Sequence, residues 1–133
     1  MAGETSLATL ISSMRPQLND GDYVFCTLDP PDAALGLEVL GSFREAEGLT
    51  VIVEREAAQQ AGLAFDYVAA WITLNVHSAL QAVGLTAAFA SALGKAGISC
   101  NVIAAYYHDH IFVSRADADR AMDVLWELSR KGE

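Results

Sequence analysis

Basic residues are scarce in this sequence. Eight Lys and Arg stand against seventeen Asp and Glu, which gives a net charge of −9 at pH 7 over 133 residues. Proteins that bind nucleic acids neutralise phosphates with Lys and Arg, so the field of this chain would repel a nucleic acid. The same repulsion acts at an anionic membrane surface. We therefore expect neither nucleic acid nor membrane among the partners of this protein.

Long apolar runs and a secretion signal are also missing. No uncharged apolar stretch approaches the roughly 18 residues that span a bilayer, and Glu4 stands where a signal peptide carries basic residues. The two cysteines, Cys26 and Cys100, are too few for a disulfide framework and do not form a Cys-x-x-Cys pair. These absences predict a cytoplasmic protein whose cysteines are reduced, buried, small apolar residues.

Motifs of catalysis and of cofactor binding are absent as well. The sequence holds no Gly-x-Ser-x-Gly, no phosphate-binding P-loop, no Gly-x-Gly-x-x-Gly and no Cys-His constellation of evident spacing. The charges within 54–60 and 115–120 are typical of solvated helix faces that favour the helix dipole. We therefore predict a protein that is not an enzyme and that carries neither a cofactor nor a metal.

What the sequence has in quantity is apolar material for a packed core. Hydrophobic residues make up 53% of the chain, enough for one domain or for two small units that share a core. Apolar residues at helical spacing predict helices before Pro16, over 54–62, from Leu85 to Gly97 and after Ser114. Thr5 is the expected cap of the first helix, and Ser114 with Asp117 of the last. β-rich or alternating segments predict strands at 23–28, 37–43, 49–53, 71–77, 101–107 and 110–113.

The second half of the chain has the element order strand, helix, strand, strand, helix, with both helices apolar on one side only. This order predicts an α+β fold, namely a ferredoxin-like, βαββαβ-type antiparallel sheet with helices on one face. An internal echo indicates two related halves, because 50–61 superposes on 110–121 with several identical residues. An unpaired edge strand must be covered, so we expect pairing between the halves or between the protomers of a homodimer.

Three short motifs carry a resemblance to a known family. They are Gly84-Leu85 at a helix start, Leu93 to Ile98 with its Ala-Gly-Ile end, and the polar step Ser99-Cys100-Asn101. With these motifs, residues 71–128 resemble an ACT domain, a small regulatory module that binds amino acids. The whole chain is similar to small stand-alone bacterial ACT-domain proteins, although its turn "LQAVGL" lacks the proline that members often carry. The resemblance implies an N-terminal ACT-like half at 1–66, a C-terminal ACT domain at 67–133 and a non-catalytic sensor of a small molecule, above all an amino acid.

One candidate ligand site follows from the residues and from the resemblance. It consists of Val83, Gly84, Leu85 and Thr86, together with Ser99, Cys100 and Asn101. Unpaired backbone N–H groups at a helix start suit a carboxylate, and Gly84 lets a ligand approach the backbone closely. Asn101 offers a donor and an acceptor to an amino acid across a strand-to-helix or dimer seam. Plainer interpretations stay open, namely an ordinary strand-to-helix turn at Gly84 and an Asx turn at Asn101.

His108, Asp109 and His110 raise the question of a metal site. Histidines two positions apart on an extended chain put both rings on one face, but a site needs a third protein ligand, and His77 is the only other histidine. We interpret the cluster as a polar hairpin tip, because the internal echo puts 44–48 at the equivalent hairpin without a histidine. The alternatives to a sensor are a metal-binding or enzymatic α+β protein that uses His77, His108 and Asp109, or a purely oligomerising interaction module.

Overall fold

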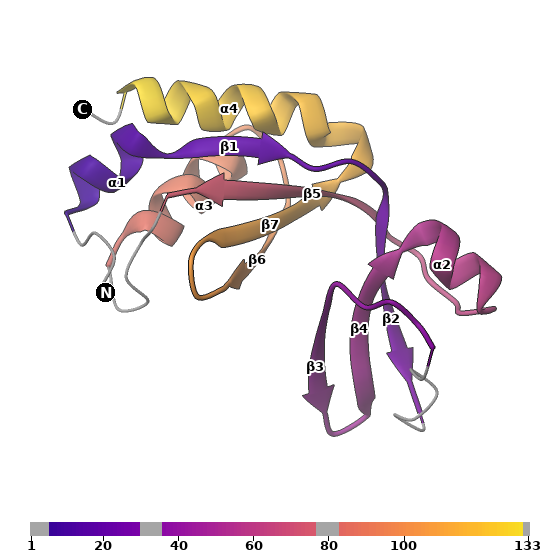
Figure 1. The fold of residues 1–133 in the computed structure, drawn as a ribbon. Helices are drawn as coiled ribbons and strands as arrows, with labels where there is room; N and C mark the ends of the chain where they lie inside the picture. The colour runs from indigo at the N-terminus through magenta and orange to yellow at the C-terminus, as the bar shows by residue number, and fades with distance from the viewer. Residues whose placement is uncertain (1–5, 30–35, 77–82, 132–133) are drawn as a thin grey trace. The chain divides into compact units, whose positions relative to one another are not determined.

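A computed structural model describes residues 6–29, 36–76 and 83–131 of the chain (Figure 1). The chain forms two compact units. Unit 1 consists of Met1–Asp20 and Ala70–Glu133, and unit 2 is the intervening segment Gly21–Ala69. Unit 1 is therefore built from both ends of the chain. The division that we expect between residues 66 and 67 concerns related halves of the sequence rather than compact units, and it stays a prediction.

Unit 1 combines three helices with a sheet. Its elements are α1 (Leu7–Ser13), β1 (Arg15–Leu18), β5 (Val68–Asn75), α3 (Leu85–Lys95), β6 (Cys100–Ala104), β7 (Asp109–Ser114) and α4 (Ala118–Lys131). The strand order is β1-β5-β7-β6, in which β1 is antiparallel to β5 and β6 is antiparallel to β7. β6 is the outer strand at one end of this order. The first two residues of β5 belong to unit 2.

The helices of unit 1 cover one face of its sheet. Ile72 and Leu74 of β5 are fully buried, and in β7 the same is true of Ile111 and Val113. All four side chains belong to one core, together with Phe89 of α3. Alternate residues of a strand point to opposite faces, so the helices lie on the face that carries these four residues. In Figure 1, α4 lies along β1. The predicted α+β fold of ferredoxin-like type, with an antiparallel sheet and one-sided helices, is confirmed.

Unit 2 has a second, smaller core. Its elements are β2 (Tyr23–Leu28), β3 (Gly41–Glu45), β4 (Gly48–Glu54) and α2 (Arg55–Gln60). The strand order is β3-β4-β2, continued by the first residues of β5, and every pair is antiparallel. Val24, Cys26 and Val51 are buried in the core of this unit, together with Ala58 of α2.

The two segments of the internal echo, 50–61 and 110–121, occupy equivalent positions in the two units. Val53 near the end of β4 and Val113 near the end of β7 are both fully buried. In each unit the strand is followed at once by a helical turn, and Ala58 and Ala118 are both buried in the helix that follows. The matched residues therefore fill the same structural roles. The prediction of two related halves is confirmed.

Three local predictions are corrected. Ser114 makes no side-chain cap hydrogen bond, because a 3₁₀ turn at Arg115–Asp117 separates it from α4. The strand predicted at 101–107 ends at Ala104. β1 was not expected, since Pro16 indicated only the end of a helix. Thr5, the predicted cap of α1, lies outside the described residues, and Ser6 occupies the N-cap position. No helix in the described part of the chain has the length and apolarity to cross a bilayer.

Candidate functional site

α3 begins at Leu85, and Gly84 before it offers no capping side chain to the first N–H groups of the helix. Gly84 is the N-cap residue and has a φ of +101°. This φ lies in the left-handed region, which residues other than glycine rarely adopt. A Cβ at this position would also lie 3.1 Å from Cδ2 of Leu7 in α1. The backbone conformation therefore favours glycine here, and a Cβ would in addition require a small shift of the Leu7 side chain.

The neighbours of Gly84 differ in what they can offer a ligand. Val83 is 83% exposed, and Thr86 is exposed as well. Leu85 is buried in the core of unit 1. Leu85 could therefore contribute only its backbone N–H to a ligand, whereas the side chains of Val83 and Thr86 border the helix start.

The second group of candidate residues lies where β6 begins. Ser99 is exposed in the connection before the strand, Cys100 packs against the core, and Asn101 is exposed opposite Phe112 of β7. Neighbouring strand residues point to opposite faces, so Cys100 faces the helices and Asn101 faces away from them. Burial raises the pKa of Cys100 to about 11. Its thiol is therefore protonated at neutral pH and is a poor nucleophile.

One copy of the chain does not bring the two groups together. α3 contains 11 residues, which corresponds to a length of about 16 Å. Gly84 stands at the start of this helix, whereas Asn101 follows the tight connection at its end, in which Ile98 N donates to Leu93 O at 2.9 Å. β6 then runs back alongside α3, so that the C-terminal end of β6 is the end nearer to the helix start.

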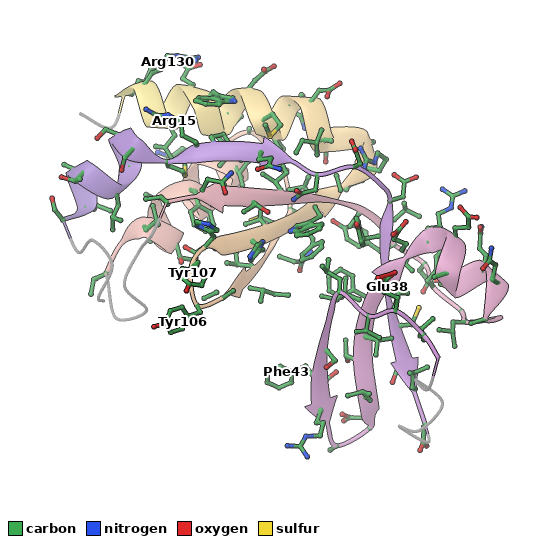
Figure 2. All side chains as sticks on the ribbon, in the orientation of Figure 1. Arg15, Glu38, Phe43, Tyr106, Tyr107 and Arg130 are labelled. Atoms are coloured by element: carbon green, nitrogen blue, oxygen red, sulfur yellow. The ribbon has the colours of Figure 1, made fainter. Side chains whose placement is uncertain are left out.

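The His-Asp-His cluster is divided between a turn and a strand. His108 lies in the turn between β6 and β7, whereas Asp109 and His110 are the first two residues of β7. Figure 2 shows Tyr106 and Tyr107 at this turn, where their side chains are 65% and 62% exposed. The prediction of a polar hairpin tip is therefore wrong for Asp109 and His110, because pairing of β7 with β6 includes both residues.

The ring of His110 is held by neighbouring side chains. Trp71 Nε1 of β5 donates to His110 Nδ1 at 3.0 Å, and Thr73 Oγ1 lies 3.2 Å from the same nitrogen. No three His, Cys, Asp or Glu side chains among the described residues are placed to hold a metal ion. His77, the remaining candidate ligand, lies outside those residues. The alternation of polar residues along 71–77 indicated a polar strand face, but nothing in the sequence indicated that this face meets His110.

Two models of the ACT-domain family match the chain in tandem. One matches residues 2–70 and the other matches residues 67–127. Together they account for nearly the whole chain. A comparison with curated proteins gives no match.

Solved structures resemble the chain over most of its length. A Vibrio cholerae protein of unknown function, described as a possible transport protein, is 53% identical with a TM-score of 0.86, over 94% of this chain and 97% of that one. An Agrobacterium tumefaciens protein is 19% identical with a TM-score of 0.65, over 87% of this chain and 89% of that one. The regulatory subunit of aspartate kinase from Thermus flavus is 11% identical with a TM-score of 0.64, over 96% of this chain and 99% of that one. At the last two identities the similarity concerns the fold alone.

Proposed function

Because the chain belongs to the ACT-domain family, we propose that it is a regulatory module that binds a small molecule, an amino acid above all, and catalyses no reaction. The observation that carries this proposal is the tandem match of two ACT-domain models over residues 2–70 and 67–127. The shared fold with the regulatory subunit of an aspartate kinase is consistent with it. Both cysteines are free thiols, which agrees with a cytoplasmic location as part of the same proposal.

The carboxylate of the ligand binds at the start of α3. Gly84 leaves the backbone open to close approach, and the first N–H groups of the helix sit at the positive end of its dipole. Leu85 contributes its N–H, and the exposed side chains of Val83 and Thr86 flank the bound group. The helix start stabilises a bound carboxylate without the help of a basic side chain. Such a site does not depend on Lys or Arg, which are scarce in a chain with a net charge of −9.

The second half of the site comes from another copy of the chain. Among the described strands β6 is the outer one of the unit 1 sheet, and its outer edge can pair with the β6 of a second copy. In an antiparallel pairing, Asn101 of each copy lies beside the C-terminal end of the other copy's β6, which is the end near that copy's helix start. Ser99 and Cys100 of one copy then complete the site that Gly84 begins in the other, and Asn101 borders the seam between the two β6 strands from the face away from the helices. The proposal is therefore a homodimer with two equivalent sites.

A thermal-shift screen against the twenty amino acids tests the proposed function. A ligand that binds only the folded state at 100 times its Kd stabilises that state by about 2.7 kcal/mol, which raises the Tm by several degrees. We expect such a rise for at least one amino acid. The matched controls are the amine without the carboxylate and the carboxylate without the amine, and both should act more weakly than the amino acid.

The same screen separates the alternatives. A profile that is flat for all amino acids and rises with Zn²⁺ or Ni²⁺ would replace the sensor by a metal-binding protein. A Tm that changes with protein concentration but with no added ligand or metal would indicate a module that only oligomerises. Either result contradicts the proposed function.

A further inference from the structure

A row of hydrogen-bonded polar side chains crosses the face of the unit 1 sheet that lies opposite the helices. Trp71 and Thr73 alternate in β5 with buried Ile72, and Gln17 of β1 stands opposite Thr73 in the register. The row consists of Asn75, Gln17, Asn19, Thr73, His110 and Trp71. Asn75 Nδ2 donates to Gln17 Oε1 at 3.0 Å, and Gln17 Nε2 donates to Asn19 Oδ1 at 3.3 Å. Asn19 Nδ2 donates to Thr73 Oγ1 at 2.9 Å, which connects the row to His110.

The chemistry of Trp71 fixes the protonation state of His110. An indole N–H can donate a hydrogen bond but cannot accept one. Since Trp71 Nε1 lies 3.0 Å from His110 Nδ1, this nitrogen must be the acceptor. The imidazole is then neutral, with its proton on Nε2. The hydroxyl of Thr73, which accepts from Asn19, is free to turn its own proton toward the same Nδ1.

We propose that His110 is a proton-operated latch: its neutral ring accepts the indole N–H of Trp71 and so ties β7 to β5 by a side-chain bond, and protonation of the ring breaks this bond. A second proton on the ring must sit on Nδ1, where it would face the N–H of Trp71. Two donors at hydrogen-bond distance repel each other, so the N–H of Trp71 loses its acceptor on the ring, whereas the new Nδ1–H can donate to Thr73 Oγ1. The Trp71 bond is therefore lost on protonation, and Thr73 must reverse its role toward the ring.

The electrostatic surroundings of His110 agree with the latch. Within unit 1, β5 presents the uncharged Trp71 and Thr73 to the ring, and β6 presents Ile103, which stands opposite His110 in the register. The titratable groups that act on it are His108 and Asp109. Burial lowers the pKa of His110 below its ordinary value of 6.5, the charge of His108 lowers it further, and Asp109 opposes both effects. A depressed pKa means that the stabilisation is present above pH 6.5 and is lost as the pH falls through the pKa of the folded state.

The latch acts where the chain leaves and re-enters unit 1. Asn19 precedes Gly21, the first residue of unit 2, and Trp71 follows Ala70, where unit 1 resumes. The backbone N–H of Asn19 donates to Trp71 O at 2.9 Å, and its Nδ2 donates to the same oxygen at 3.3 Å. Release of the ring therefore frees the indole of Trp71 beside these two crossing points, while the bonds from Asn19 to Trp71 O remain. This regulation is independent of the ligand site.

NMR titration of the Trp71 indole N–H tests the latch. In ¹⁵N-labelled Trp126→Phe protein, which retains Trp71 as its single indole, we expect the indole resonance to shift with one midpoint below pH 6.5. Its hydrogen-exchange protection should fall over the same range. The ¹⁵N shifts of the His110 ring should show a neutral imidazole with its proton on Nε2 at pH 8. An indole resonance without an inflection between pH 8 and 4.5, or a proton on Nδ1 at pH 8, overturns the proposal.

Two variants assign the inflection to His110. His110→Asn offers an amide oxygen near the position of Nδ1 but does not titrate, so the indole resonance should lose its inflection. His108→Asn is the matched control, because it removes the neighbouring histidine, and it should keep the inflection with a midpoint moved to higher pH. An inflection that persists in His110→Asn contradicts the latch. If His110→Asn does not fold, the ring ¹⁵N shifts in the His108→Asn protein decide the question alone.

Discussion

Phe89→Ala is expected to destabilise unit 1 by about 3–5 kcal/mol. Phe89 projects from α3 and is fully buried, and no other fully buried side chain of the described residues is larger than a phenylalanine. Its removal leaves a cavity that the surrounding core of unit 1 can fill only in part. Small domains are stable by only about 5–15 kcal/mol, so the change removes a large share of the total.

Urea denaturation followed by tryptophan fluorescence measures this loss. Both tryptophans, Trp71 and Trp126, belong to unit 1, so their emission reports on the unfolding of that unit. Ser91→Ala is the matched control, because Ser91 is exposed on the same helix and its change should stay within about 0.5 kcal/mol. A loss below about 1 kcal/mol for Phe89→Ala would show that α3 does not pack on the sheet as described.

Thr86→Glu is expected to abolish amino-acid binding without a loss of stability. Thr86 is exposed in the first turn of α3, where a carboxylate favours the helix dipole by roughly 0.3–1 kcal/mol. The same charge repels the carboxylate of a ligand and competes for the N–H groups at Gly84. Direct replacement of Gly84 is a poorer test, because at its φ of +101° any side chain strains the backbone and so affects the fold itself.

Isothermal titration with the amino acid found in the screen measures this effect. Ser91→Glu introduces the same charge in the middle of α3 and should bind as the unmodified protein does. Asn101→Ala should weaken binding by roughly 1–3 kcal/mol, because it removes one polar partner of the ligand. Unchanged affinity in Thr86→Glu would place the ligand elsewhere on the molecule.

Much of the fold could be predicted from local patterns. β2 was expected at 23–28 and lies at Tyr23–Leu28, because a short β-rich run between turn residues leaves little freedom in its bounds. α3 was expected from Leu85 to Gly97 and lies at Leu85–Lys95. It could be predicted because its apolar residues recur on a single face of the helix. The spacing of apolar residues follows from which face of a helix or strand is buried, so it can be read from the sequence alone.

Features set by tertiary contacts could not be predicted. β1 is only four residues long, and it is a strand because it pairs with β5 from Arg15 opposite Asn75 to Leu18 opposite Ile72. Its partner lies more than fifty residues away in the sequence, and no local sequence pattern indicates a pairing between such distant segments. The same holds for unit 1, whose two segments are separated in the chain by the whole of unit 2.

The residues of the candidate site stay a prediction, and their arrangement in space could not be inferred from the sequence. Gly84 precedes α3, as the sequence indicated, whereas its positive φ was not expected. The length of α3, however, keeps it apart from Asn101 in one copy, which a list of residues could not reveal. His110 was assigned to a hairpin tip from the internal echo. The bonds that hold its ring come from β5 and are visible only in the folded sheet.

Complementation between two variants that are impaired in binding tests the shared site most directly. Thr86→Glu damages the helix-start half of the site and Asn101→Ala damages the strand half, so each variant alone should bind the amino acid weakly or not at all. In a mixed dimer, the proposed arrangement combines an unmodified helix start from one copy with an unmodified Asn101 from the other. We expect titration of the mixed protein, after exchange of subunits, to recover binding with full affinity at one site in each mixed dimer. No recovery of binding in demonstrated mixed dimers would contradict a ligand site shared between two copies.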